Sequence, residues 1–87
     1  MTPDHEPDRQ RFTLPTVPPS VLDYELGAGQ VVFTHTVVPP EYRGQGLAAQ
    51  LVTAGLQWAR EQGLKVVPVC SYTAHFLQRH PEWRDLS

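Results

Sequence analysis

The sequence of 87 residues has few cysteines, no long apolar run and no excess of positive charge, and each of these absences excludes a class of protein. Its single cysteine, Cys70, cannot form an internal disulfide, and one cysteine with scattered histidines makes no zinc framework, so we expect no metal site. No apolar run approaches the ~20 residues that span a bilayer, so we expect no membrane contact. Seven basic against nine acidic residues leave a formal charge of −2, which disfavours nucleic acid as a partner.

The N-terminal stretch also lacks apolar residues. It has no basic and then apolar pattern of a secretory signal, so we expect a cytoplasmic protein. Residues 1–10, MTPDHEPDRQ, hold two prolines, several charges and no apolar residue other than the initiator methionine. We expect a disordered arm there, followed by one small domain over residues 11–87.

The remaining chain has the pattern of a small α/β domain. RFTL at 11–14 predicts a short strand, and VLDYEL at 21–26 alternates in polarity as a half-buried strand does. QVVFTHTVV at 30–38 predicts a longer strand, and the glycines before it indicate an antiparallel hairpin.

The second half predicts a helix, a strand and another helix. Apolar residues recur at helical spacing from Gly46, and Gly63 stands where a C-terminal glycine cap belongs. LKVVPVC at 64–70 predicts a buried strand, and a second helix follows over about 71–80, before Pro81. A strand–helix–strand succession of this length predicts a right-handed parallel crossover.

Two glycines stand at the start of the longer helix, in RGQG at 43–46. Inside a helix, a glycine lowers stability by roughly 1 kcal/mol relative to alanine. Two glycines at a helix start therefore indicate a specific structural or functional requirement. If strands 30–38 and 64–70 are parallel neighbours, this helix starts at the carboxyl edge of the sheet, where ligands bind. Free N–H groups, the helix dipole and the positive charge of Arg43 favour a phosphate group there. A tight turn into the helix explains the bare spacing equally well.

Three separated blocks then carry a resemblance to a known family. RGQGLA at 43–48 resembles the R/Q-x-x-G-x-G/A motif by which the GNAT superfamily of N-acetyltransferases binds the pyrophosphate of acetyl-CoA. FTHTVVPPEYRGQGLAAQLV, GLKVVPVC and RHPEWRDL look like the small single-domain subgroup often called YjdJ-type. The match covers about residues 11–87. It implies an α/β (α+β) minimal GNAT fold: a four-stranded mixed sheet with a parallel central pair, and two helices.

The resemblance implies a two-part site for acetyl-CoA. Main-chain N–H groups of 43–48 would hold the pyrophosphate, and strand 30–38 would bind the pantetheine arm as an added strand does. In this superfamily the parallel strands splay apart, which fits Pro68, although an edge strand also explains a proline there. His75 lies either near the phosphates or on a solvated helix face. The expected contacts to coenzyme A are Thr36, Val37, Val38, Arg43, Gly44, Gln45, Gly46, Leu47, Ala48, Ser71 and His75.

Cys70 is a candidate for the chemistry at the thioester. It ends the second parallel strand, where the acetyl group should arrive, and the following helix N-terminus favours its thiolate. Three readings stay open. Cys70 accepts the acetyl group and passes it on, or it only shapes the pocket during direct attack by the amine, or it is a small buried strand residue.

Two other residues are catalytic candidates. The family's larger members often use a tyrosine of the second helix as the acid, but alignment places that position on Gln78, which cannot act as an acid. Tyr72 is the nearest substitute. His35, which we expect to share a strand face with Phe33 and Val37, is either a core histidine, the favoured reading, or a general base near the acceptor.

The resemblance implies acetyl-CoA-dependent N-acetylation of a primary amine. Full-length relatives carry further strands that wall the acceptor site, so we expect an acceptor side that is open or completed by a partner, for example in a homodimer. The acceptor is a protein lysine or N-terminus, or a small polyamine. The alternative is a sensor or carrier that binds CoA or acyl-CoA with little or no turnover. A plain interaction domain, which would not bind CoA at all, is a third reading.

Overall fold

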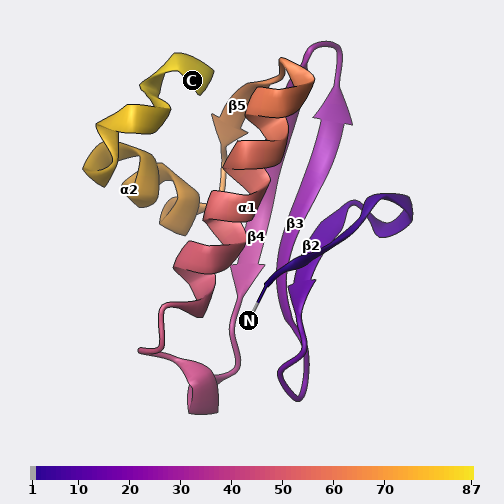
Figure 1. Ribbon diagram of the computed structural model, residues 1–87, viewed down its shortest axis with the longest axis vertical. Coiled ribbons are helices and arrows are strands. Elements are labelled where there is room, and N and C mark those ends of the chain that lie inside the picture. Colours follow the sequence, from indigo (N-terminus) through magenta and orange to yellow (C-terminus); the bar gives the residue numbers. More distant parts are fainter. Residues whose placement is uncertain (1) are drawn as a thin grey trace.

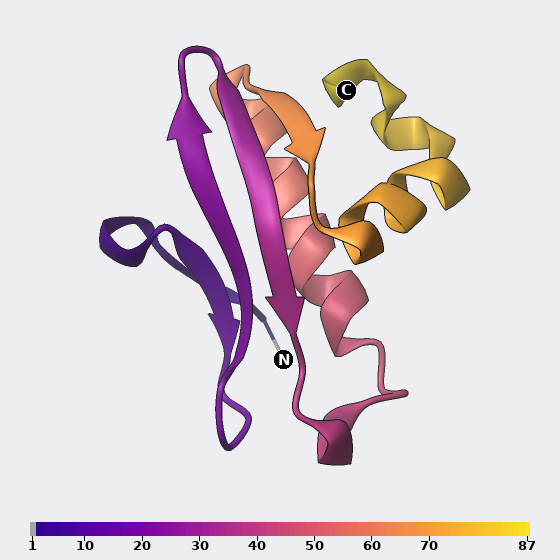
Figure 2. The ribbon, with the colours of Figure 1, turned by 180° about the vertical axis from the view of Figure 1, so that it is seen from behind.

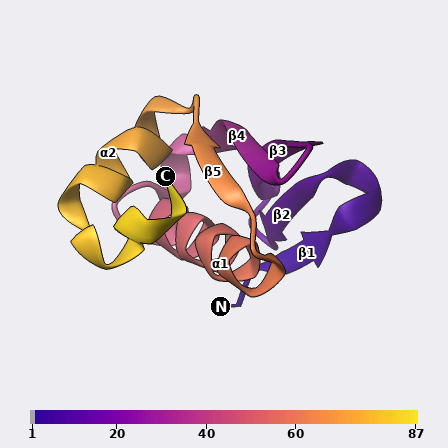
Figure 3. The same cartoon turned by 90° about the horizontal axis from the view of Figure 1, so that it is seen from above.

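The computed structural model, which describes residues 2–87, has one sheet, with one long helix packed against one face and a shorter helix beside the edge of the last strand (Figures 1 and 3). Across the sheet the strands are β1 (Asp4–Glu6), β2 (Arg11–Leu14), β3 (Ser20–Gly27), β4 (Gln30–Val37) and β5 (Lys65–Pro68). The α-helices are α1 (Leu47–Gln62) and α2 (Ser71–Arg79). Three short 3₁₀ helices are η1 (Pro7–Arg9), η2 (Pro40–Tyr42) and η3 (Pro81–Leu86).

The pairing predicted for the middle of the chain is confirmed. β3 and β4 form an antiparallel hairpin, and β5 pairs parallel with β4 after the α1 crossover. Gly63 ends α1 with a left-handed φ of 69°, and its N–H donates to carbonyls of the last turn. That conformation is the one for which glycine is favoured after a helix.

The number of strands is a correction, because the sheet has five strands and not four. The fifth, β1, lies within residues 1–10, where we expected a disordered arm. It pairs antiparallel with β2, and the His5 ring stacks on Phe12 with centroids 4.2 Å apart. His5 Nε2 also lies 2.5 Å from the Tyr24 hydroxyl. Cross-strand pairing and aromatic contacts hold this polar segment, and neither is visible in its composition.

A β-bulge in β4 reverses the expected facing of its second half. Tyr24 pairs with Phe33, but the residue before it, Asp23, pairs with His35 and not with Thr34. Thr34 is therefore an extra residue on β4. His35 therefore shares the outer face with Asp23 and is exposed, and the favoured reading of a core histidine is wrong. Figure 2 shows this outer face of the sheet, over which no helix of residues 2–87 lies.

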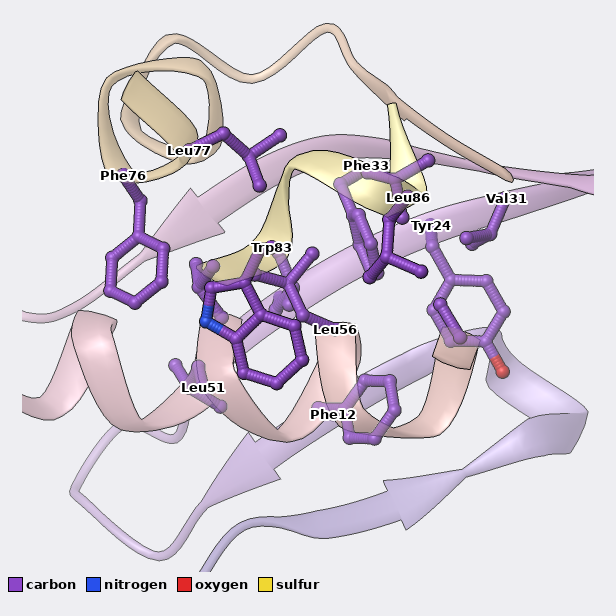
Figure 4. Close-up of a cluster of buried hydrophobic side chains, with 14 of the residues drawn as sticks. Phe12, Tyr24, Val31, Phe33, Leu51, Leu56, Phe76, Leu77, Trp83 and Leu86 are labelled. Carbon is purple, nitrogen blue, oxygen red and sulfur yellow. The ribbon is translucent and has the colours of Figure 1, made fainter. Parts of the chain in front are cut away.

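The core lies between the inner sheet face, α1, α2 and η3. Figure 4 shows its side chains converging from these elements. Trp58 packs against Tyr24, with ring centroids 4.9 Å apart, and Trp83 is buried beneath the Arg60 guanidinium. Both tryptophans are packing residues, as predicted. This packing fixes the start of α1 beside the second half of β4.

Candidate functional site

The loop from η2 into α1 is built by two glycines with left-handed backbone. Gly44 has φ of 83° and Gly46 has φ of 76°, a region that residues with a side chain rarely adopt. A β-carbon on either glycine would meet no protein atom within 4 Å. The space beside both glycines is therefore open, and the backbone can be approached closely by a ligand.

The first turn of α1 leaves main-chain N–H groups without helix partners. The first helical hydrogen bond runs from the Gln50 N–H to the Gly46 carbonyl, at 3.1 Å. The N–H groups of Leu47, Ala48 and Ala49 precede it, so they have no carbonyl four residues back within the helix. Together with the positive end of the helix dipole, they form a cradle suited to an anion.

β4 has an unpaired edge beyond the end of β5. The parallel pairing stops at Phe33 opposite Pro68, where proline offers no N–H to the ladder. The Cys70 N–H then donates to the Phe33 carbonyl at 2.8 Å, and the chain turns into α2. Residues 34–37 of β4 run on without a partner from β5, as Figure 2 shows. An extended ligand can pair with this edge as an added strand does.

One pocket of about 510 Å³ joins the helix start to this strand edge. It is lined by residues of β4, the glycine loop, the first turn of α1 and the start of α2. These are Thr36, Val37, Val38, Tyr42, Arg43, Gly44, Gly46, Leu47, Ala48 and Tyr72. We call it the main pocket.

A second pocket, of about 440 Å³, lies between α1 and α2 and shares Tyr72 with the main pocket. Its polar lining comes from Ser71, His75, Arg79 and His80. His75 and Arg79 are exposed, so their side chains are accessible to a ligand. We call it the side pocket.

The structure thus brings most of the predicted site residues together. The expected coenzyme contacts line the main or the side pocket, except Gln45, which is exposed and lines neither. His35 lies on the outer face of the sheet and lines neither pocket. Tyr42 was missed by the sequence reasoning, although its place in PPEYRG, one residue before the motif, was a usable signal.

Cys70 lies behind the wall of the main pocket, 9% exposed. Thr36 Oγ1, which lines that pocket, lies 3.2 Å from Cys70 Sγ. Burial acts to raise the pKa of the thiol, but the Thr36 hydroxyl and the backbone N–H groups of Tyr72 and Thr73 outweigh it, so the net pKa is lowered. A lowered pKa increases the share of the thiolate, which is the nucleophilic form.

Tyr72 stands where the two pockets meet, and 39% of its surface is exposed. Partial burial raises the pKa of its phenol, and the nearby Arg79 charge only partly opposes this. The hydroxyl is therefore protonated at neutral pH and able to donate a proton or a hydrogen bond.

Residues 2–87 offer neither a metal-binding cluster nor a membrane-spanning helix. Residues 2–87 contain no cluster of three or more metal-ligating side chains. Neither helix in that range combines the length and apolar character that crossing a membrane requires.

Known proteins resemble this chain in sequence and in structure. A profile of the GCN5-related N-acetyl-transferase family matches residues 11–86. The chain is 33% identical to Protein NATD1 of Gallus gallus and of Homo sapiens over 82 residues, covering 90% of this chain and 74% and 73% of those proteins. A GCN5-like protein of Staphylococcus aureus, solved by NMR, superposes with a TM-score of 0.78 at 24% identity, covering 97% of this chain and 84% of that one.

The structural likeness shows a shared α+β fold with a mixed sheet, and the sequence matches extend over most of the chain. The glycine loop, the free helix start and the open β4 edge lie within the matched residues. The chain therefore belongs to the GCN5-related N-acetyltransferase family.

Proposed function

We propose that the protein transfers the acetyl group of acetyl-CoA to a primary amine. One observation carries the proposal: a single pocket connects a phosphate-type cradle at the start of α1 with the unpaired edge of β4. Family membership supports a transferase, because the family generally uses acetyl-CoA. Acetyl-CoA supplies an activated acetyl thioester, and the chain's own residues bind it and place the acceptor.

The glycine loop fits the pyrophosphate of this co-substrate. The open space beside Gly44 and Gly46 is where a β-carbon would otherwise stand, so two phosphate groups can reach the N–H groups of the first turn. Arg43 is exposed at the same loop, and its Nε donates to the Val38 carbonyl at 3.3 Å. This bond keeps the guanidinium beside the pocket, where its charge attracts phosphate.

The β4 edge and the side pocket fit the two remaining parts of the co-substrate, which are its pantetheine arm and its nucleotide end. Main-chain groups of Thr36, Val37 and Val38 are available to the amides of the pantetheine arm. The side pocket, with Ser71, His75 and Arg79, suits the nucleotide end, because it adjoins the cradle and carries a positive charge.

Two routes for the acetyl group remain in the proposal. In the first, the amine attacks the thioester directly, Tyr72 protonates the departing CoA thiolate, and Cys70 shapes the inner wall. In the second, the Cys70 thiolate attacks the thioester, the CoA thiolate leaves and takes up a proton from Tyr72, and the amine then attacks the acetyl-cysteine and releases the Cys70 thiolate. His35, which is exposed on the outer sheet face next to Thr36, is the candidate base in either route.

Four finer assignments belong to the same proposal. The chain is a member of the YjdJ-type subgroup, it works in the cytoplasm, and its acceptor is a protein lysine or N-terminus or a small polyamine, with a homodimer as one way to complete the acceptor side. The second candidate function is a sensor or carrier of acyl-CoA. It is favoured by the residue at position 78, a glutamine that offers no proton to the leaving thiol.

Release of free thiol from acetyl-CoA, with and without a panel of primary amines, tests the proposal. Amine-dependent thiol release together with an acetylated amine in the mass spectrum supports transfer. Calorimetric binding of CoA without any thiol release supports the sensor. No binding of CoA contradicts both.

Mass spectrometry of the protein after incubation with acetyl-CoA separates the two routes. An acetyl adduct on Cys70 that is lost on adding amine supports the second route. The absence of an acetyl adduct on Cys70 of the parent protein, together with full activity of Cys70→Ala, supports direct transfer. Because the chain has one cysteine, a thiol adduct has only one position to occupy.

A further inference from the structure

Thr36 and Cys70 are brought together by the bulge in β4. Without the extra residue Thr34, regular alternation from Phe33 would turn Thr36 to the outer face. With it, Thr36 pairs with Leu22, a fully buried core residue, and faces the helices. Its hydroxyl thereby reaches the Cys70 sulfur at 3.2 Å and lines the main pocket at the same time.

A second hydroxyl lies beside the same sulfur without a partner of its own. Thr73 is fully buried, and its Oγ1 makes no hydrogen bond of good geometry. Like the Thr36 hydroxyl, it acts to lower the pKa of the Cys70 thiol. A buried hydroxyl without a hydrogen-bond partner lowers the stability of the fold. Its position beside the sulfur therefore indicates that it binds a group in one state of the site.

Burial acts to raise the pKa of this thiol, and hydroxyls and main-chain N–H groups, not formal charges, act to lower it. Next to Cys70 and to Thr36 in the sequence, the nearest titratable side chains are Tyr72 on α2 and His35 on β4, respectively. Tyr72 keeps its proton to higher pH than usual, and His35 faces the other side of the sheet. Thr36, on β4, lies within hydrogen-bond distance of the sulfur, and its hydroxyl is able to donate to a thiolate there.

We infer that Thr36 is a positioning residue for Cys70: its side-chain hydroxyl fixes the sulfur at the inner wall of the main pocket and favours the thiolate there. The thiolate is the form of cysteine that attacks acyl carbon, so Thr36 sets how much of the protein is competent for such an attack. Only this last consequence rests on the proposed function. The contact between the Thr36 hydroxyl and the Cys70 sulfur is present in the protein without CoA.

The test is the pH titration of Cys70 in the free protein, followed by NMR of ¹³Cβ-labelled cysteine. One cysteine gives one signal, and no CoA is needed, so failure of the proposed function does not affect the result. Thr36→Val should move the titration to higher pH, and Thr36→Ser should restore it. At pH 7 the Val variant should react with iodoacetamide roughly three- to tenfold more slowly, the effect of one lost hydrogen bond.

Thr53→Val, which removes an exposed hydroxyl on α1, is the matched control and should titrate as the parent does. An unchanged titration in Thr36→Val, or a Ser variant that behaves as the Val variant does, would overturn the inference. The parent protein gives an independent reading that needs no variant. If Cys70 in the folded chain titrates at or above its pH in the urea-unfolded chain, the inference is likewise overturned.

Discussion

Gly55 of α1 packs so closely on Phe33 of β4 that a β-carbon on Gly55 would lie 2.9 Å from the ring carbon Cε1. The same β-carbon would lie 3.0 Å from Leu22 Cδ2, and both neighbours are fully buried. This contact sets the distance between α1 and the sheet. It therefore also sets the distance between the free helix start and the unpaired edge of β4.

Gly55→Ala should destabilise the protein, although alanine is the better helix former. Helix propensity alone predicts a gain of about 1 kcal/mol, but overpacking against a buried ring costs about 1–3 kcal/mol. We expect a net loss of roughly 1–2 kcal/mol in the free energy of urea unfolding. Gly27→Ala is the control, since its β-carbon would meet only the flexible Gln30 side chain, at 3.2 Å. A Gly55→Ala protein more stable than the parent would contradict the packing argument.

Gly46→Val should abolish CoA binding in calorimetry while the fold remains. The valine side chain would fill the open space through which a pyrophosphate approaches the first turn of α1. It also imposes a left-handed backbone on a branched residue, at a cost of roughly 1–2 kcal/mol. Gly29→Val imposes the same strain at φ of 71° in the β3–β4 turn, away from the pockets. Equal binding by the two variants would refute the cradle.

Arg79→Gln should weaken CoA binding by about two- to fivefold, the effect of one exposed charge on an anionic group. Arg79 lines the side pocket, which we assign to the nucleotide end. The difference from the parent should shrink in 0.5 M salt, because screening reduces the interaction of exposed charges. Arg9→Gln, in η1, is the control and should bind as the parent does. An effect that is independent of salt would point to a structural role for Arg79.

Thr73→Val should raise the melting temperature, with a gain of about 1 kcal/mol or less. Valine has nearly the shape of threonine and removes the buried hydroxyl that lacks a hydrogen-bond partner. Thr73→Ala, which leaves a cavity, should lower the melting temperature and so report on packing at this position. A clear loss of stability in the Val variant would mean that the hydroxyl is bonded in solution.

Stability should fall as the pH drops below about 6.5, in part because of His5. Burial lowers the pKa of this imidazole in the folded chain, so below 6.5 the unfolded chain takes up the proton first. The unfolded state then binds more protons, and acidification favours it. Melting temperatures from pH 7.5 to 5.5 should fall less in His5→Phe, which keeps the stacking on Phe12. Parallel curves for the two proteins would show that His5 is not the group responsible.

Elements with a local signal were predictable from the amino-acid pattern. Alternating polarity gave the β3–β4 hairpin, the helical spacing gave α1 up to Gly63, and RGQGLA marked the ligand loop. These patterns need only the period of a strand, the period of a helix and the backbone freedom of glycine. The resemblance to the GNAT superfamily, and not these periods, gave Thr36, Val37 and Val38 as pocket residues, and Tyr42 was missed.

The facing of β4 and the formation of β1 depend on contacts between segments that are distant in the sequence. The extra residue Thr34 reverses every later side chain of β4, which turns His35 outward and Thr36 toward Cys70, 34 residues further along the chain. A bulge is set by pairing with the neighbouring strand, so period-two reasoning within one strand cannot reveal it. β1 likewise forms because His5 finds aromatic partners in β2 and β3, which its own polar segment does not contain.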